Sequence, residues 1–217
     1  MEASIFDIIG NGISNEEISN VIKLKLYEKY GKEFIVKMIG NRYGMDSNDT
    51  ETTFCSPKDN DRLLFTAILN KEQTILKDDY IFRSMKFELE ECIEKLFEEK
   101  NFDVIVRIET IGINKFDEKL TVQEFIDKFN NFNFLAYIIT KDVVSKEILK
   151  EIYESLRNKY NNIYLKSLIY MLEEEDFYEC FETIKSSPVI SIAFIEQYVI
   201  KDEIIMNIVN EKVFIIK

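Results

Sequence analysis

Apolar residues recur every three or four positions in several segments of the chain, which is the spacing of one face of a helix. The first such segment follows Ser14 and Glu17, which have the spacing of a capping box, and ends before Gly31, a residue suited to the left-handed end of a helix. A second capping box, Thr121 and Glu124, predicts a short helix. Helices are expected over residues 14–30, 79–100, 121–129 and 145–158.

Alternating or continuous apolar stretches between these helices are typical of β-strands. Val104, Val106 and Ile108 alternate with positions that include the charged Arg107 and Glu109, as in a half-exposed strand. The apolar residues 132–140 predict a strand in the middle of a sheet. Strands are expected over residues 33–39, 50–56, 62–69, 103–109, 132–140, 163–172, 177–184, 189–200, 204–209 and 213–216.

The part of the chain after residue 163 is predicted to form an antiparallel meander. Its apolar segments are short, and the charged residues 173–176 and 201–203 have the composition of turns. The tail from Ser187 could instead contain a helix, because short apolar stretches do not distinguish the two structures. The whole pattern predicts an α+β fold with amphipathic helices packed on antiparallel sheet.

Two of the predicted helices have similar patterns, and each leads into a strand. The matching residues are Glu17, Ile18, Ile22, Leu26, Lys29 and Tyr30 in the first, and Glu147, Ile148, Ile152, Leu156, Lys159 and Tyr160 in the second. The chain could therefore consist of two similar helix-plus-meander halves, residues 1–110 and 111–217, with separate cores or a shared one. The alternative is that amphipathic helices resemble one another without any duplication.

The composition excludes several kinds of chemistry. The chain has no histidine, so the common catalytic triads and imidazole metal sites are absent. Cys55, Cys92 and Cys180 are widely separated and form no CxxC pair, so they predict buried free thiols and no zinc site. Gly10 and Gly12 lack the further glycine of a phosphate-binding loop. We expect no cofactor and favour a non-catalytic protein.

The net charge of −12 narrows the range of partners. A nucleic acid or an anionic membrane surface would repel the chain on average, so neither is an expected partner. The first 20 residues lack the pattern of a secretory signal, and no apolar stretch has the roughly 20 residues needed to span a bilayer. These features predict a cytoplasmic protein and leave its oligomeric state open.

The distribution of acidic residues suggests how the protein works. Glutamates lie opposite the apolar stripe of the helix at 79–100, and a contiguous acidic run follows residue 172. Such residues could bind a basic surface on another protein, as an inhibitor or an immunity-type protein does. The alternative is an ordinary solvated face. The residues predicted to bind the partner are Glu88, Glu91, Glu94, Glu98, Glu99, Glu173, Glu174, Glu175 and Asp176.

Two other functions are compatible with the sequence. A metal-dependent hydrolase could use the loop carboxylates Asp46, Asp49, Asp59 and Asp61, because hard cations prefer oxygen ligands. These residues do not follow the spacing of the helix-loop-helix calcium site and are also consistent with solvated turns. The third possibility is a self-associating structural subunit that uses exposed aromatic residues.

Overall fold

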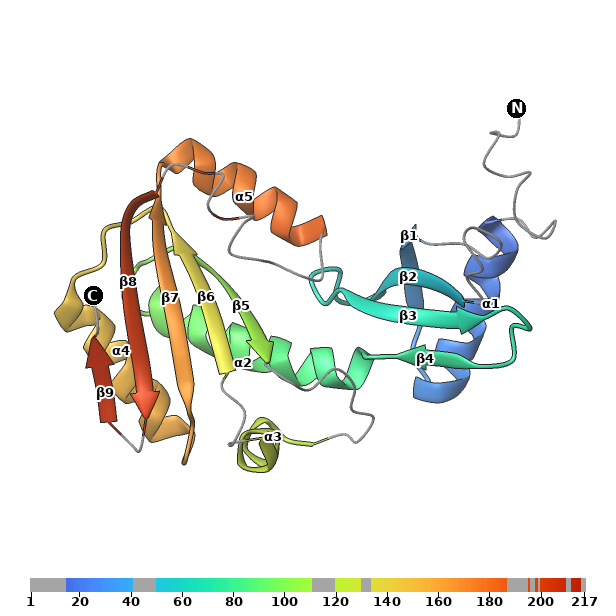
Figure 1. Cartoon of the computed structure of the whole chain (residues 1–217), viewed down its shortest axis with the longest axis horizontal. Helices are drawn as coiled ribbons and strands as arrows, with labels where there is room; N and C mark the ends of the chain where they lie inside the picture. The colour runs from blue at the N-terminus through green and yellow to red at the C-terminus, as the bar shows by residue number, and fades with distance from the viewer. Residues whose placement is uncertain are drawn as a thin grey trace. The chain divides into compact units, whose positions relative to one another are not determined.

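The helices and strands of the chain form two structural units (Figure 1). The computed structural model describes residues 15–40, 50–110, 120–129, 134–186, 195, 198, 200–209 and 212–215. The units are Met1–Arg83 and Ser84–Lys217, so the division lies inside the helix α2 (Tyr80–Glu98), whereas the two halves expected from the sequence meet after residue 110. Each unit combines helices with a sheet, which confirms the predicted α+β class. No helix within the described ranges is long and apolar enough to cross a bilayer.

The first unit is a helix followed by an antiparallel sheet. Its elements are α1 (Asn15–Tyr30), β1 (Phe34–Ile39), β2 (Thr50–Pro57), β3 (Phe65–Asn70) and β4 (Leu76–Asp78). The strands pair in the order of the chain, and all neighbours are antiparallel, as in a meander. Gly31 ends α1 with a left-handed φ of 66°, as predicted, and its amide donates to the Tyr27 carbonyl at 2.8 Å. The capping box expected at Ser14 lies outside the described residues.

Asp78 at the end of β4 ties α1 to this sheet. Its carboxylate accepts hydrogen bonds from Lys29 Nζ at 2.9 Å and from the Tyr30 hydroxyl at 2.6 Å. The ring of Tyr30 packs edge-on against Tyr80, with centroids 4.8 Å apart. The strand β4 has three residues and was not predicted, because so short a strand shows no alternation. The buried residues of α1 are Ile18, Ile22 and Leu26.

The second unit contains a five-stranded mixed sheet. Besides most of α2, its elements are β5 (Val104–Thr110), α3 (Val122–Phe129), β6 (Phe134–Thr140), α4 (Lys146–Lys159), β7 (Leu165–Leu172), α5 (Glu174–Ser186), β8 (Ile200–Val209) and β9 (Lys212–Ile215). The strand order is β5-β6-β7-β8-β9, and β6 and β7 are parallel. The expected antiparallel arrangement therefore holds for the other strand pairs of this sheet and not for β6 with β7. The reason is that α4 carries the chain back, so that β7 starts at the end where β6 started.

The segment after β7 forms the helix α5, so the prediction of a strand over residues 177–184 is wrong. Phe177, Cys180 and Ile184 are buried, and their spacing of three and four residues places them on one face of a helix. The acidic residues of the predicted turn form the first turn of this helix, where the helix dipole favours negative charge. The segment is therefore amphipathic with a helical period, which short strands do not have.

The end of the chain also differs from the expected pattern of strands. Residues 201–203 were predicted to form a turn, but they belong to β8, where Asp202 and Glu203 pair with β7. The strand expected over residues 189–200 lies almost entirely outside the described residues. The antiparallel pairing of β7 with β8, and of β8 with β9, agrees with the predicted meander.

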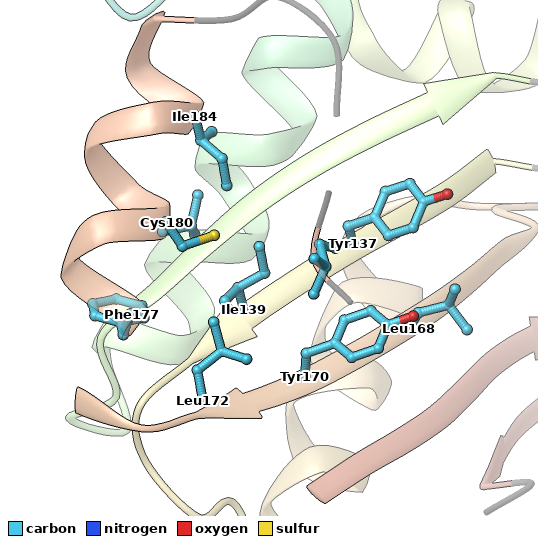
Figure 2. Packing of buried hydrophobic residues seen from close by; sticks show 10 residues of the cluster. Tyr137, Ile139, Leu168, Tyr170, Leu172, Phe177, Cys180 and Ile184 are labelled. Atoms are coloured by element: carbon cyan, nitrogen blue, oxygen red, sulfur yellow. The ribbon is translucent and has the colours of Figure 1, made fainter. Parts of the chain in front are cut away.

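Helices cover both faces of the mixed sheet. On one face, Cys180 and Ile184 of α5 point toward Ile139 and the neighbouring strand residues (Figure 2). On the opposite face, Tyr153 of α4 lies beside Ser167 of β7. Ser167 faces away from α5 because side chains alternate along a strand and its neighbour in sequence belongs to the cluster below α5. Burial raises the pKa of the Tyr153 phenol, as expected inside a core.

Candidate functional site

Carboxylates of α2 cover the outer edge of β5. This strand is the first in the sheet order, and the described strand that pairs with it is β6. On the other edge, Glu94 Oε1 accepts a hydrogen bond from the Val106 amide at 3.1 Å, and Glu90 Oε1 accepts one from the Ile108 amide at 2.8 Å. Alternate amides of a strand point to the same edge. The two carboxylates therefore take the place of a neighbouring strand and protect an edge that could otherwise pair with another chain.

Arg107 joins α2 to α5 across this edge. Its Nη1 donates to Glu90 Oε2 at 3.3 Å, and its Nη2 donates to the Ile184 carbonyl at 3.4 Å. The Arg107 and Glu90 side chains are 5% and 1% exposed. A charge in such surroundings is costly without its partner, so each of these residues depends on the other.

The burial of Glu94 removes it from the surface set expected from the sequence, because its exposed fraction is 7%. Glu90 and Arg107 are not among the site residues predicted from the sequence. Both glutamates directly follow residues of the apolar stripe, Leu89 and Ile93, and they are four positions apart on the border of the buried face. That spacing is the signal that could have identified them.

The chain leaves the carboxyl ends of β6 and β7 toward opposite faces of the sheet. β6 leads into α4 and β7 leads into α5, and these helices cover different faces. In open α/β sheets, ligands commonly bind where the connections of two neighbouring parallel strands diverge in this way. Lys141 directly follows β6, and Glu174 begins α5. By analogy with such sheets, this end of the second unit is the candidate functional site.

Lys141 links three segments at this site. Its Nζ donates to the Tyr178 hydroxyl at 2.9 Å and lies 3.3 Å from Asp103 Oδ2 and 3.7 Å from Glu174 Oε1. Asp103 precedes β5, whereas Glu174 and Tyr178 belong to the first turns of α5. The hydrogen bonds to Tyr178 and Asp103 raise the pKa of Lys141, so the side chain stays charged at neutral pH. The lysine holds the neighbouring carboxylates in position.

Further carboxylates lie on the segments that meet at this end of the sheet. Glu91 and Glu88 are exposed but lie about two turns or more before Glu98 on α2, a separation of at least roughly 10 Å along the axis. Asp176 is partly buried. The acidic residues predicted to bind a partner therefore do not all lie exposed at this end of the sheet. We use the name acidic end for the exposed residues Glu98, Glu99, Asp103, Glu173, Glu174 and Glu175.

The loop carboxylates considered as metal ligands form a turn where the structure describes them. Asp59 and Asp61 are exposed between β2 and β3, and the side chain of Asn60 accepts a backbone hydrogen bond of 3.2 Å within the same turn. Asp46 and Asp49 lie outside the described residues. Among the residues that the structure describes, no three Asp, Glu or Cys side chains are grouped so that they could hold a metal ion.

Comparisons with known proteins concern the fold. Neither a protein family nor a curated protein matches the chain. Among solved structures, the chain resembles a DUF5037 family protein from Ruminococcus gnavus. The two chains are 19% identical, the alignment covers 91% of this chain and 94% of that chain, and the TM-score is 0.64. At this level of identity, the similarity shows that the two proteins share a fold over most of their length.

A cavity of about 390 Å³ lies near the other end of α4. Gln123 of α3 fixes its border, because its side chain donates to the Asn161 carbonyl and accepts from the Asn161 amide, both at 3.0 Å. The length of α4, roughly 20 Å, separates this cavity from the acidic end. The lining residues are Arg157, Asn158, Asn161, Asn162 and Ile163.

Proposed function

We propose that this protein is a non-catalytic binding protein whose acidic end covers a basic surface on another protein, as an inhibitor or an immunity-type factor would. The observation that supports this function is the placement of exposed carboxylates on three segments that Lys141 connects. Unlike a dispersed solvated face, such an arrangement presents negative charge in one region of the second unit. The net charge of −12 adds a long-range attraction for basic proteins.

The contacts of Lys141 also affect the cost of binding. Asp103 and Glu174 are held by a cation within the protein, so they lose little conformational freedom when a partner binds. Glu98, Glu99 and Glu175 are exposed and can approach arginine or lysine side chains of the partner directly. Charges at such exposed positions mainly raise the association rate, and they make binding sensitive to salt.

The test compares two variants that lose the same number of exposed carboxylates. The first, E98Q/E99Q/E173Q/E175Q, neutralises four carboxylates of the acidic end and keeps Asp103 and Glu174, and the matched control E16Q/E28Q/E72Q/E91Q neutralises exposed positions elsewhere. A protein captured from lysate by the wild type is purified, and its affinity for all three proteins is measured by calorimetry at low and high salt. We expect the affinity to fall in the first variant and to persist in the control.

The salt dependence gives a second readout of the same proposal. Screening lengths shrink from about 10 Å at 0.1 M salt to about 3 Å at 1 M, so wild-type binding should weaken strongly over that range. The acidic-end variant should show a much smaller dependence. Equal losses of affinity in the two variants, or a captured protein that is acidic, would contradict the proposal.

The proposal includes a cytoplasmic location. Cys55, Cys92 and Cys180 are free thiols, and the cytoplasm is the compartment that keeps thiols reduced. A fusion to a fluorescent protein in the source cell, followed by fractionation, tests this location. Recovery of the fusion in the medium would contradict it.

Self-association is a second candidate function, supported by two side chains of α1. Leu24 and Tyr27 are 58% and 53% exposed and lie one turn apart on the outer face of this helix. Paired apolar side chains at such positions are typical of weak interfaces. Light scattering would then give a mass above 25.7 kDa for the wild type and a monomer for L24E/Y27E. A monomeric wild type would argue against this function.

A further inference from the structure

Cys92 of α2 contacts a lysine and a tyrosine at the end of α4. Lys159 Nζ donates to the Cys92 sulfur at 3.1 Å, and the Tyr160 hydroxyl lies near the same thiol. Lys159 is the last residue of α4 and Tyr160 is its C-cap. An amine, a phenol and a thiol are thereby held together by two helices of the second unit.

The other two cysteines lack this combination of groups and exposure. Cys92 is 7% exposed, whereas Cys55 and Cys180 are each 0% exposed. Burial raises the pKa of the Cys55 thiol to about 11 and that of the Cys180 thiol to about 12. Oxidants react with the thiolate form, so these two cysteines are poor targets. They serve as internal references for the reactivity of Cys92.

We propose that Cys92 and Lys159 form a peroxide-sensitive pair, in which oxidation of the sulfur is followed by a covalent bond between the two side chains. The distance of 3.1 Å between Nζ and the sulfur places the amine within van der Waals contact of the atom it would attack. Formation of the bond therefore needs little movement of either helix. The pair acts as a reversible link between α2 and α4.

The chemistry takes place in two steps. A hydroperoxide transfers one oxygen atom to the Cys92 thiol, so the sulfur is oxidised by two electrons to sulfenic acid and the peroxide is reduced to water or an alcohol. The neutral amine of Lys159 then attacks the sulfur. The S–N bond forms, the S–O bond breaks, and the hydroxyl leaves with one amine hydrogen as water. The product is a sulfenamide, which a thiol reductant cleaves to regenerate both side chains.

Tyr160 is positioned to assist the second step. Burial, together with the contact with Cys92, raises the pKa of its phenol above the ordinary value of 10.0, so the hydroxyl stays protonated. A protonated phenol next to the sulfur can donate a hydrogen bond to the sulfenic oxygen as that oxygen leaves. Lys159 is exposed, so its amine can exchange its proton with solvent before the attack.

The link would restrain the second unit in its unfolded state as well as in its folded state. Cys92 and Lys159 are separated by 67 positions, and a bond that closes a loop of this size lowers the entropy of the unfolded chain. An oxidised sample should therefore melt at a higher temperature than a reduced one. The same bond would fix the contact between α2 and α4.

The test treats the full chain with hydrogen peroxide at mildly alkaline pH and analyses it by mass spectrometry. The expected product is the intact protein with a loss of two hydrogens, which digestion maps to a cross-linked peptide pair containing Cys92 and Lys159. A thiol reductant should restore the original mass. The melting temperature should rise with the cross-link and return after reduction.

Variants separate the roles of the two side chains. K159R keeps the cation but removes the nucleophilic amine, so Cys92 should stop at the sulfenic acid, which dimedone traps. K100R is the matched control, because Lys100, two residues after α2, pairs with Glu151 of α4 at 2.7 Å without contacting sulfur, and it should cross-link like the wild type. Identical products from the wild type and K159R, or a cross-link at Cys55 or Cys180, would overturn the proposal.

Discussion

The Glu90 carboxylate accepts the backbone amide of Ile108 at 2.8 Å, and its second oxygen lies 3.3 Å from Arg107 Nη1. One side chain of α2 thus satisfies an edge amide of the sheet and neutralises a buried guanidinium. Each contact satisfies a buried polar group, since β5 needs hydrogen-bond acceptors on its outer edge and Arg107 needs an anion in the interior. Part of the acidic character of α2 therefore serves the fold.

Replacement of Glu90 is predicted to destabilise the second unit strongly. The variant E90A leaves the Ile108 amide without its acceptor and Arg107 without its anion, so we expect a loss of about 3–5 kcal/mol in the free energy of unfolding. The exposed neighbour Glu91 provides the control, because E91A should change stability by less than about 0.5 kcal/mol. Urea unfolding monitored by circular dichroism measures both. Similar stabilities of the two variants would contradict the role assigned to Glu90.

Glu94 should distinguish an acceptor for the sheet edge from a partner-binding charge. E94Q keeps an oxygen that can accept the Val106 amide, whereas E94A leaves this buried amide without the acceptor, at a cost of about 1–3 kcal/mol. We expect E94A to be the less stable of the two variants, while both bind the partner as the wild type does. A loss of partner affinity in E94Q at unchanged stability would show that the charge of Glu94 serves binding.

The local features of the fold could be predicted from the sequence. The capping box at Thr121 forms as expected, since Glu124 accepts from the Thr121 amide at 2.8 Å and the Thr121 hydroxyl accepts from the Glu124 amide at 3.3 Å. Ser145, which begins the helix expected over residues 145–158, caps α4. Such features depend on residues within one helical turn, so the sequence alone contains the information.

The features that the sequence did not predict depend on distant residues. The parallel pairing of β6 with β7 results from the path of α4, and the burial of Glu94 results from contact with β5, twelve positions away along the chain. The helix α5 was missed for a different reason. Phe177 and Cys180 are separated by three positions, but the surrounding apolar residues also suited a short strand, and the length did not distinguish the alternatives.

The helical structure of α5 can be tested by substitutions at positions that a helix would bury and a strand would expose, or the reverse. With Phe177 facing the core, a strand would also bury residues 179 and 183, whereas the helix buries Cys180 and Ile184. The variant I184A should therefore lose about 2–5 kcal/mol of unfolding free energy, and E179A should lose little. Chemical denaturation measures both. A larger loss for E179A would favour the strand.

The contacts of Asp78 predict that the first unit loses stability in alkaline solution. Burial lowers the pKa of Lys29, but hydrogen bonds to Tyr30 and Asp78 outweigh it and raise that pKa above the ordinary 10.5. Burial and Asp78 likewise raise the pKa of Tyr30 above its ordinary 10.0. Both groups hold protons in the folded state that the unfolded chain releases, so their contribution to stability is complete below about pH 10 and falls as the pH rises further.

We expect the melting temperature to drop in this range for the wild type and for the control K25M/Y27F. The variant K29M/Y30F should be less stable at neutral pH and show a flatter decline, and a decline as steep as that of the wild type would refute the assignment.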